Sequence, residues 1–367
     1  MGADEAIRRA RFRLGDQMDR DRTGDRPMRV GLVGLGYWGP NLLRVLVEHD
    51  GAEVAWICDV DGSRLDKFSR RYPTVKATNS YDDLLADDTV DAIFIATPVF
   101  SHFELASRSL EAGKHTFVEK PLAPSPDEAD QLMDLAAEHG LTLMCGHTFL
   151  YSPPVRMVRE MLDERALGDL YFISSSRVNL GLHQPDVSVI WDLGPHDFSI
   201  LLYWLGEMPS SVRAQGRDSI VPGIPDVAFV TLTFPDGMLV NVELSWLAPS
   251  KLRRTVLVGS DKMVVYADGT PEPLRIYDSG VVYEDPETFG QYHLSYRTGD
   301  ITSPRVDAAE PLMAELSDFL GAARRGVVRH EFAEIARNVV VLLAAADHSL
   351  GEGGELVPLE ESARTTA

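Results

Sequence analysis

A glycine-patterned turn after a short apolar strand is the feature that most constrains how this chain can fold. The segment Arg29–Gly39 reads Arg-Val-Gly-Leu-Val-Gly-Leu-Gly-Tyr-Trp-Gly, and a helix is expected directly afterwards. Within it, Gly34, Gly36 and Gly39 fit the spacing G-x-G-x-x-G. The first glycine permits a tight turn, the second lets the backbone approach a pyrophosphate, and the third lets helix and strand pack closely. The N–H groups at the helix start favour phosphate binding.

The residues that follow this turn support a dinucleotide site. A second apolar strand, Glu53–Cys58, ends at Asp59, about 20 residues beyond the turn, where a carboxylate can bind the ribose of the cofactor. Such a carboxylate accepts hydrogen bonds from a ribose 2′-OH and repels a 2′-phosphate, so Asp59 predicts NAD in preference to NADP. The nearest basic residue, Arg64, is expected too far into the following helix to change this preference.

The composition indicates a globular protein with room for two domains. The chain has 367 residues, of which 44% are hydrophobic and 25% are charged. Its formal net charge of −21 argues against general affinity for nucleic acid or anionic membranes. No apolar run approaches the roughly 18 residues needed to cross a bilayer. The cysteines Cys58 and Cys145 each end an apolar run, so we expect them to be buried rather than disulfide-bonded or metal-bound.

The N-terminal residues 1–27 are rich in Arg and Asp and contain no apolar core of the kind found in a signal peptide. We expect a disordered extension there, with Met28 as a candidate natural start. The lack of a secretory signal and the sparse cysteines predict a cytoplasmic location.

Residues 28–148 alternate apolar strands with amphipathic helices. This alternation predicts a parallel sheet covered on both faces, as in a Rossmann domain. The expected strands are Arg29–Gly34, Glu53–Cys58, Ala92–Ala96, His115–Val118 and Thr142–Cys145. The expected helices are Asn41–His49, Arg64–Arg71, Tyr81–Ala86, Phe103–Ala112 and Pro126–His139. Ligands of such sheets bind at the carboxyl ends of the strands, so the chemistry is expected there.

Residues 149–360 are predicted to form a second domain with an antiparallel sheet. Asp236-Gly237 lies between two apolar runs, which is a strong hairpin signal. The expected strands are Leu170–Asn179, Ala228–Phe234, Met238–Leu247, Thr255–Val258 and Met263–Tyr266. The expected helices are Pro154–Glu164, His196–Leu205 with Pro195 in its first turn, Pro311–Ala323 and Glu331–His348. The C-terminal helices can pack back on the first domain.

A lysine stands directly after an expected strand, in Glu119-Lys120-Pro121. At the carboxyl end of a buried strand, its ammonium can reach the nicotinamide end of the cofactor and hydrogen-bond a substrate hydroxyl. Partial desolvation would lower the pKa of Lys120 toward a useful range. The alternative is a surface pair of Lys120 and Glu119, and the residues alone do not decide between the two.

An aspartate and a histidine lie four residues apart in Trp191-Asp192-Leu193-Gly194-Pro195-His196-Asp197. An acid in this position, at a helix start, can orient the imidazole and hold its tautomer. The alternative interpretation makes Asp192 a helix N-cap and His196 a packed side chain. The dinucleotide pattern and Lys120, taken together, favour the functional interpretation.

In combination, these motifs resemble one known family. They are Gly34-x-Gly36-x-x-Gly39, Asp59, Ala96-Thr97-Pro98 with His102, Glu119-Lys120-Pro121 and Asp192-x-Gly194-x-His196-Asp197. In this order, from residue 28 to residue 350, they resemble the glucose–fructose oxidoreductase, inositol dehydrogenase and MocA family. The resemblance implies a Rossmann domain followed by an α+β domain with a large, open, mostly antiparallel sheet. It also implies hydride transfer between NAD and a carbon that bears a hydroxyl or a ketone, with no metal.

The resemblance implies roles for single residues as well. Lys120 corresponds to the lysine that contacts the reacting hydroxyl, His196 to the acid or base, and Asp192 to the aspartate that completes this catalytic group. The implied cofactor-binding residues are Gly34, Gly36, Tyr37, Trp38, Gly39, Asp59, Thr97, Pro98, His102, Glu119 and Lys120. Among them, Glu119 corresponds to a residue near the nicotinamide ribose.

Two segments, Gly36–Asn41 and Ser174–Gly181, resemble family members that act on nucleotide-linked sugars, which include 3-dehydrogenases and 3-ketoreductases. Arg177 and Asn179 could bind a sugar hydroxyl or a phosphate, or could be ordinary polar residues of the sheet. The predicted substrate contacts are Lys120, Tyr151, Arg156, Arg177, Asn179, His183, Asp192 and His196.

Three alternatives stay open at this point. One is a dehydrogenase of a free polyol or monosaccharide, as for inositol. Another is an NAD-binding regulator without turnover, and a third is an oxidoreductase that retains its cofactor through a full cycle. Apolar side chains on both faces of the second sheet predict self-association, as a homodimer or homotetramer.

Overall fold

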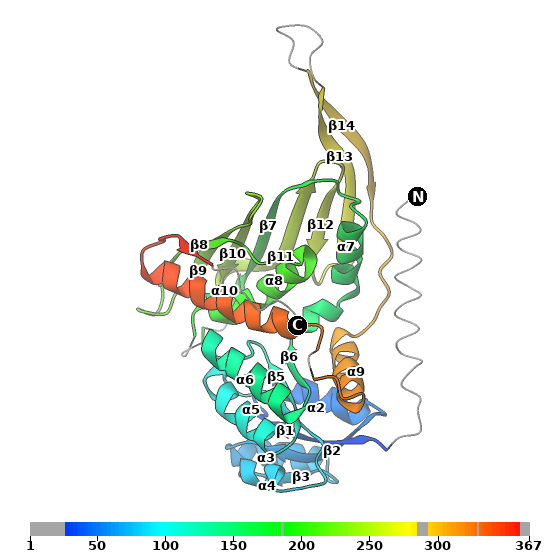
Figure 1. Cartoon of the computed structure of the whole chain (residues 1–367), viewed down its shortest axis with the longest axis vertical. Helices are drawn as coiled ribbons and strands as arrows, with labels where there is room; N and C mark the ends of the chain where they lie inside the picture. Colours follow the sequence, from blue (N-terminus) through cyan, green and yellow to red (C-terminus); the bar gives the residue numbers. More distant parts are fainter. Residues whose placement is uncertain (1–25, 182, 185–186, 285–292, 329, 360–367) are drawn as a thin grey trace. The chain divides into compact units, whose positions relative to one another are not determined.

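The computed structural model (Figure 1) describes residues 26–181, 183–184, 187–284, 293–328 and 330–359. These residues divide into two compact units. The first unit contains residues 26–151 and 309–341, and the second contains residues 152–308 and 342–359. Residues 1–25 of the expected N-terminal extension lie outside the described residues.

The first unit is built on a six-stranded, all-parallel sheet in the order β3-β2-β1-β4-β5-β6. Its strands are β1 (Met28–Val33), β2 (Ala52–Cys58), β3 (Lys76–Thr78), β4 (Ala92–Ile95), β5 (His115–Glu119) and β6 (Leu143–Gly146). The strands β4 and β6 are buried throughout, as expected for a parallel sheet covered on both faces, so the Rossmann prediction is confirmed. The sequence pattern misses β3 because that strand has three residues and buries none of them.

Helices cover this sheet on both sides. They are α2 (Gly39–Glu48), α3 (Gly62–Arg71), α4 (Tyr81–Leu85), α5 (His102–Glu111), α6 (Pro126–His139), α9 (Pro311–Arg324) and the first part of α10 (Ala333–Gly351), with short 3₁₀ turns at Val99–Ser101 and Thr148–Tyr151. The helix α9 returns from late in the chain because Phe319 packs edge-on against Phe94 and Phe117, at centroid distances of 5.1 and 5.6 Å.

The second unit is built on a nine-stranded sheet in the order β14-β13-β12-β11-β7-β10-β9-β8-β15. Its strands are β7 (Leu170–Leu180), β8 (Ser211–Arg217), β9 (Val227–Thr233), β10 (Leu239–Ser245), β11 (Leu247–Gly259), β12 (Met263–Ala267), β13 (Leu274–Glu284), β14 (His293–Thr302) and β15 (Val357–Pro358). Only the β7–β10 pair is parallel among the described strands of this sheet, so the mostly antiparallel prediction is confirmed. The helices α7 (Pro153–Asp163) and α8 (Val189–Leu205) and the end of α10 lie on one face (Figure 1).

Helix α8 and strand β14 differ from what the sequence predicts for this unit. Helix α8 begins at Val189, seven positions before the expected start, and Pro195 lies inside it rather than in its first turn. The fully buried side chains of Val189 and Ile190 explain the longer helix, because their burial offsets the backbone hydrogen bond that Pro195 cannot make. The strand β14 is not expected at all. Its residues 296–300 are all exposed and show no apolar alternation.

No helix in the described part of the chain is both long enough and apolar enough to span a membrane.

Candidate functional site

The glycine turn follows β1 directly and leads into α2. A Cβ atom on Gly34 would lie 2.4 Å from the carbonyl oxygen of Ala96, and one on Gly39 would lie 1.9 Å from that of Gly34. Neither position accepts a side chain, and Gly34 also has a φ of 93°. At Gly36, the one atom of the described residues within 4 Å of such a Cβ is Nη1 of Arg64, at 3.8 Å. This openness leaves the backbone accessible to a pyrophosphate.

Asp59 stands at the end of β2, as predicted, and is buried. Its Oδ2 accepts a hydrogen bond from the Leu35 N–H at 2.6 Å, and its Oδ1 accepts one from the Asp61 N–H at 2.8 Å. The carboxylate therefore joins the glycine turn to the start of α3. Its contact with a ribose stays a prediction.

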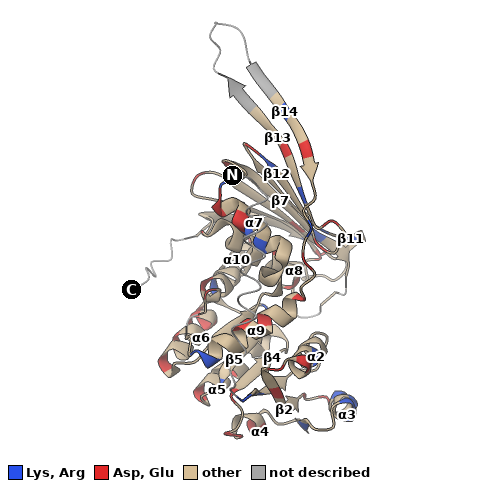
Figure 2. Ribbon diagram, turned by 90° about the vertical axis from the view of Figure 1, so that its right-hand side faces the viewer, with Lys and Arg blue, Asp and Glu red and all other residues tan. Residues whose placement is uncertain are grey.

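Arg64 lies much closer to Asp59 than expected. Because α3 begins at Gly62, Arg64 is in its first turn, with Nη1 at 3.5 Å from Asp59 Oδ2 and Nε at 3.4 Å from Asp61 Oδ2. Figure 2 shows the Lys and Arg residues gathered on α3. The expectation that Arg64 lies far from Asp59 is therefore wrong. A cation beside this carboxylate would weaken its repulsion of a 2′-phosphate, and that effect on the cofactor preference stays a prediction.

His102 ties together the loops that follow β4 and β5. Its Nε2 lies 2.8 Å from the carbonyl oxygen of Thr97, and its Nδ1 lies 2.8 Å from that of Pro121. The ring is 1% exposed, and this burial lowers the pKa of His102. His102 thus holds the Thr97-Pro98 segment and the loop that contains Lys120 and Pro121 in place. Tyr37, another predicted cofactor-binding residue, lies in the glycine turn and is 88% exposed.

Lys120 directly follows β5, at the carboxyl end of the sheet where the sequence predicts it. The peptide bond between Lys120 and Pro121 is cis. Glu119 is buried, with Oε2 at 3.4 Å from the Lys120 N–H, so the alternative of a surface pair is wrong. Burial raises the pKa of Glu119 to about 7, although the Lys120 ammonium acts in the opposite direction.

In the second unit, Asp192 and His196 lie one turn apart on α8. The indole Nε1–H of Trp246 donates a hydrogen bond to Asp192 Oδ2 at 3.0 Å. Trp246 is 1% exposed, so the bond is sheltered from water. No local pattern indicates Trp246, because it lies 54 positions from Asp192 and only the fold brings the two together.

Asp197 directly follows His196 and anchors α8 to the sheet. Arg177 of β7 donates from Nε to Asp197 Oδ2, and the Ser175 Oγ–H donates to Asp197 Oδ1 at 2.7 Å. Ser175 also hydrogen-bonds Thr255 of β11 at 2.8 Å. Arg177 and Asp197 are each 3% exposed, which favours a structural role for Arg177 over the predicted contact with a phosphate.

The other predicted substrate residues lie in both units. Tyr151, in the first unit, is 2% exposed and donates from its hydroxyl to Asp318 Oδ2 at 2.7 Å. In the second unit, His183 Nε2 lies 3.9 Å from Asp226 Oδ2, and its ring centroid is 5.1 Å from that of Trp246. Arg156 and Asn179, also in the second unit, are partly exposed.

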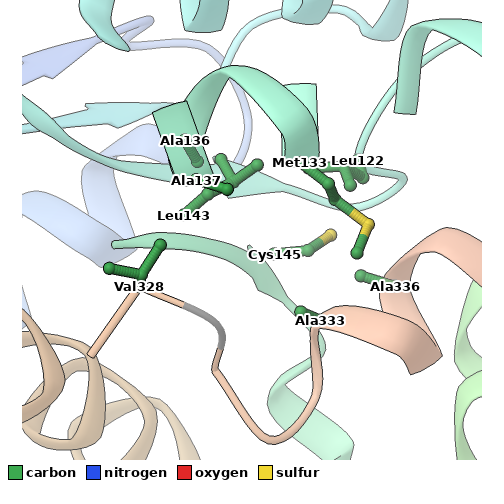
Figure 3. A pocket seen from close by; sticks show the side chains of 9 residues that line it. All are labelled: Leu122, Met133, Ala136, Ala137, Leu143, Cys145, Val328, Ala333 and Ala336. Atoms are coloured by element: carbon green, nitrogen blue, oxygen red, sulfur yellow. The ribbon is translucent and has the colours of Figure 1, made fainter. Parts of the chain in front are cut away.

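An apolar pocket of the first unit carries none of the predicted chemistry. It lies between α6, β6 and the chain around the start of α10 (Figure 3). Its lining residues are Leu122, Met133, Ala136, Ala137, Leu143, Cys145, Val328, Ala333 and Ala336.

Both Cys58 and Cys145 are buried free thiols, as expected.

Two family matches cover most of the chain. Residues 28–147 match the GFO_IDH_MocA oxidoreductase family with its NAD-binding Rossmann fold, and residues 155–265 match the GFO/IDH/MocA C-terminal domain. The chain therefore belongs to the glucose–fructose oxidoreductase, inositol dehydrogenase and MocA family of NAD-binding oxidoreductases.

Particular relatives are similar over different lengths. A UDP-N-acetylglucosamine 3-dehydrogenase of Acidithiobacillus ferrooxidans is 29% identical over 80% of this chain and 88% of its own. Its solved structure has a TM-score of 0.71 over 89% of this chain and 98% of that one, at 26% identity. A dTDP-3,4-didehydro-2,6-dideoxy-alpha-D-glucose 3-reductase of Actinomadura kijaniata is 34% identical over 46% of this chain and 51% of its own. The structure of GenD2 from gentamicin A biosynthesis, in complex with NAD, has a TM-score of 0.77 at 24% identity, covering 92% of this chain and 98% of its own.

Proposed function

We propose that this protein transfers a hydride between NAD and C3 of a nucleotide-linked sugar, interconverting a secondary alcohol and a ketone. By their names, the 3-dehydrogenase of Acidithiobacillus ferrooxidans and the 3-reductase of Actinomadura kijaniata act at carbon 3 of such a sugar. The observation that carries the proposal is the similarity to the 3-dehydrogenase, which extends over 80% of this chain and so includes residues of both units.

In this proposal the first unit binds the cofactor. Gly36 offers open backbone to the pyrophosphate, Asp59 accepts hydrogen bonds from the adenosine ribose, and Thr97 and Pro98 border the site after β4. When bound, NAD accepts the hydride of the carbon that is oxidised. The ammonium of Lys120 hydrogen-bonds the reacting hydroxyl and stabilises the negative charge that develops on its oxygen.

The second unit supplies the acid or base. His196 accepts the hydroxyl proton during oxidation and returns it during reduction. Asp192, held by Trp246, supports His196 one turn further along α8, and Asp197 keeps this turn on the sheet. We assign Arg156, Asn179 and His183 to the substrate, because each is partly exposed.

The test is to measure NADH absorbance with UDP-N-acetylglucosamine, its uronate and dTDP-linked deoxysugars, against myo-inositol and glucose. The proposal expects turnover of a nucleotide-linked sugar and little turnover of free polyols. Activity confined to free polyols would replace it with an inositol-like dehydrogenase. Binding of NAD without turnover of any candidate would favour the regulator, and NAD copurifying with the protein would favour a retained cofactor.

We further propose a homodimer or homotetramer located in the cytoplasm. Phe172, Phe229 and Leu239 of the nine-stranded sheet are 44%, 56% and 47% exposed, so a partner chain could cover them. Sedimentation of the full chain measures this directly, and a monomer at micromolar concentration would contradict it.

A further inference from the structure

Three titratable side chains of the first unit are buried on segments at or beside the carboxyl ends of β5 and β6. Glu119 ends β5, His147 follows β6, and Glu315 comes from α9; they are 8%, 2% and 0% exposed. Gly146 makes room for Glu119, because a Cβ there would lie 3.1 Å from Glu119 Oε2. Strand β5 and helix α9 thus bring two buried carboxyl groups close enough to interact, and a buried imidazole follows the neighbouring strand β6.

The hydrogen bonds of this cluster are incomplete. The Thr148 Oγ1–H donates to Glu315 Oε2 at 2.6 Å, and the side chain of Trp38 hydrogen-bonds the Glu119 carboxyl. No hydrogen-bond partner among the described residues meets Glu119 Oε1, Glu315 Oε1 or either ring nitrogen of His147. Buried polar atoms are normally paired, so four such atoms on β5, α9 and the residue after β6 indicate protonation chemistry or a ligand.

The pKa shifts of the three groups differ in direction and in size. Burial raises the pKa of Glu315 well above its usual value, and the nearby Glu119 and Asp318 raise it further, which favours the protonated form of Glu315. Burial and the Lys120 ammonium lower the pKa of His147 to about 3, so the imidazole stays neutral. Burial likewise keeps the Cys145 thiol protonated by raising its pKa. Glu119, with a pKa of about 7, is left as the group that ionises.

The position of Glu119 at the end of β5 is on the side of the sheet where the nicotinamide half of a dinucleotide is expected. The sheet order reverses between β1 and β4, and a dinucleotide bound to such a sheet would be held across that point. The glycine turn and Asp59 follow β1 and β2, so the residues that follow β4, β5 and β6 would hold the nicotinamide half. An oxidised nicotinamide ring carries a positive charge, and a reduced ring carries none.

We propose that Glu119 couples one proton to the oxidation state of the bound nicotinamide, with Glu315 as its neutral neighbour. The Glu119 carboxylate stabilises the oxidised ring, and the carboxyl group takes up a proton when the ring is reduced. Oxidation of a CH–OH carbon breaks one C–H and one O–H bond, forms the C=O bond, and yields a hydride for the cofactor and one proton. His196 accepts that proton, so the proton that Glu119 takes up comes from the solvent, and it balances the positive charge that the ring loses.

Binding measurements on the full chain test this directly. The dissociation constants of NAD⁺ and NADH are measured by calorimetry at pH 6 and pH 8. We expect NAD⁺ binding to strengthen relative to NADH binding as the pH rises, by about tenfold, the equivalent of one pKa unit. Calorimetry in buffers of different ionisation enthalpy at pH 7 should show greater proton uptake with NADH than with NAD⁺.

Two matched variants locate the effect. Glu119→Gln should abolish the pH dependence of the ratio, while Glu315→Gln, which keeps a neutral group beside Thr148, should preserve it. A wild-type ratio that is constant between pH 6 and pH 8, or an unchanged dependence in Glu119→Gln, would overturn the proposal. The wild-type proton uptake decides the matter even if a variant fails to fold. Because the test needs only cofactor binding, its outcome is independent of which sugar is the substrate.

Discussion

The two units bury charge in opposite ways. In the second unit, Asp197 meets Arg177, and Ser175 completes the hydrogen bonds of the carboxylate. In the first unit, the carboxyl groups of Glu119 and Glu315 are both buried, and each has an oxygen without a hydrogen-bond partner among the described residues. A buried pair of opposite charges holds two elements in one geometry, whereas burial of two neighbouring carboxyl groups raises their pKa values and favours the protonated form.

The buried groups of the two units therefore differ in what they do. In the second unit, the buried ion pair holds α8, and with it the turn that carries Asp192 and His196. In the first unit, we propose that the buried Glu119, next to Lys120, changes its protonation state. The following substitutions test whether the two regions differ in this way, beginning with the largest expected effect.

Replacing Lys120 should affect turnover and leave cofactor binding intact. We expect Lys120→Met to lower kcat by roughly 10²–10⁴-fold, the usual contribution of a positioned proton-transfer group. The dissociation constant for NAD should change little, because the glycine turn and Asp59 are untouched. The exposed Lys67 on α3 provides the control substitution Lys67→Met. Wild-type turnover in Lys120→Met would show that the ammonium of Lys120 takes no part in the reaction.

Breaking the opposite-charge pair should affect stability most. Arg177→Met leaves Asp197 buried and uncompensated, which costs about 3–5 kcal/mol in the free energy of unfolding. The double variant Arg177→Met/Asp197→Leu should recover most of this loss, since well-packed apolar residues can replace a buried ion pair. Urea denaturation measures both, with Arg254→Met on the exposed part of β11 as the control. A cost below about 1 kcal/mol would show that the pair does not anchor α8.

The buried imidazole should make the first unit sensitive to acid. The pKa of His147 is about 3 in the folded chain, because of burial and the Lys120 ammonium, and an unfolded histidine has a pKa of about 6.5. The unfolded state therefore binds the extra proton, and stability is lost as the pH falls from 6.5 toward 3.

At pH 5 this loss amounts to about 2 kcal/mol. His147→Leu should remove that part of the difference in unfolding free energy between pH 7 and pH 5, and replacing the exposed His139 should not. The raised pKa of Glu119 has the opposite effect, because the folded chain binds that proton and gains stability as the pH falls. The contribution of His147 is therefore read from the difference between the variant and the wild type. An identical acid sensitivity in His147→Leu would contradict the assignment.

The smallest expected effect concerns Arg64 and Asp59 in the first unit, an ion pair in which the arginine is exposed and the carboxylate is buried. Arg64 is 48% exposed beside the buried Asp59 carboxylate, so it can meet a ligand as well as its partner. Arg64→Ala should increase the preference for NAD over NADP, measured as a ratio of kcat/KM values, by about tenfold, because a cation that accommodates the 2′-phosphate is lost. Arg70→Ala, at the far end of α3, is the control. An unchanged ratio would leave Asp59 as the sole determinant at this site.

The sequence predicts the first unit better than the second. In the first unit, apolar strands are short and bounded by turn residues, so the places of Asp59 and Lys120 at strand ends are predicted directly, while their roles stay predictions. In the second unit, the start of α8 is misplaced because buried side chains outweigh the local preference of Pro195. The role of Arg177 on β7 depends on its contact with Asp197 of helix α8, 20 positions away, which no local pattern encodes.

The amino-acid sequence by itself determines the parallel sheet, the glycine turn and the family, because their requirements concern neighbouring residues: a missing Cβ, a positive φ, or an alternation of strand and helix. Only the tertiary structure decides which side chains meet. Trp246 reaches Asp192 across 54 positions, Glu315 reaches the end of β5 from a late helix, and Arg64 reaches Asp59 around a helix start. Such contacts depend on how the elements pack, and packing is settled by burial of apolar surface distributed over the whole chain.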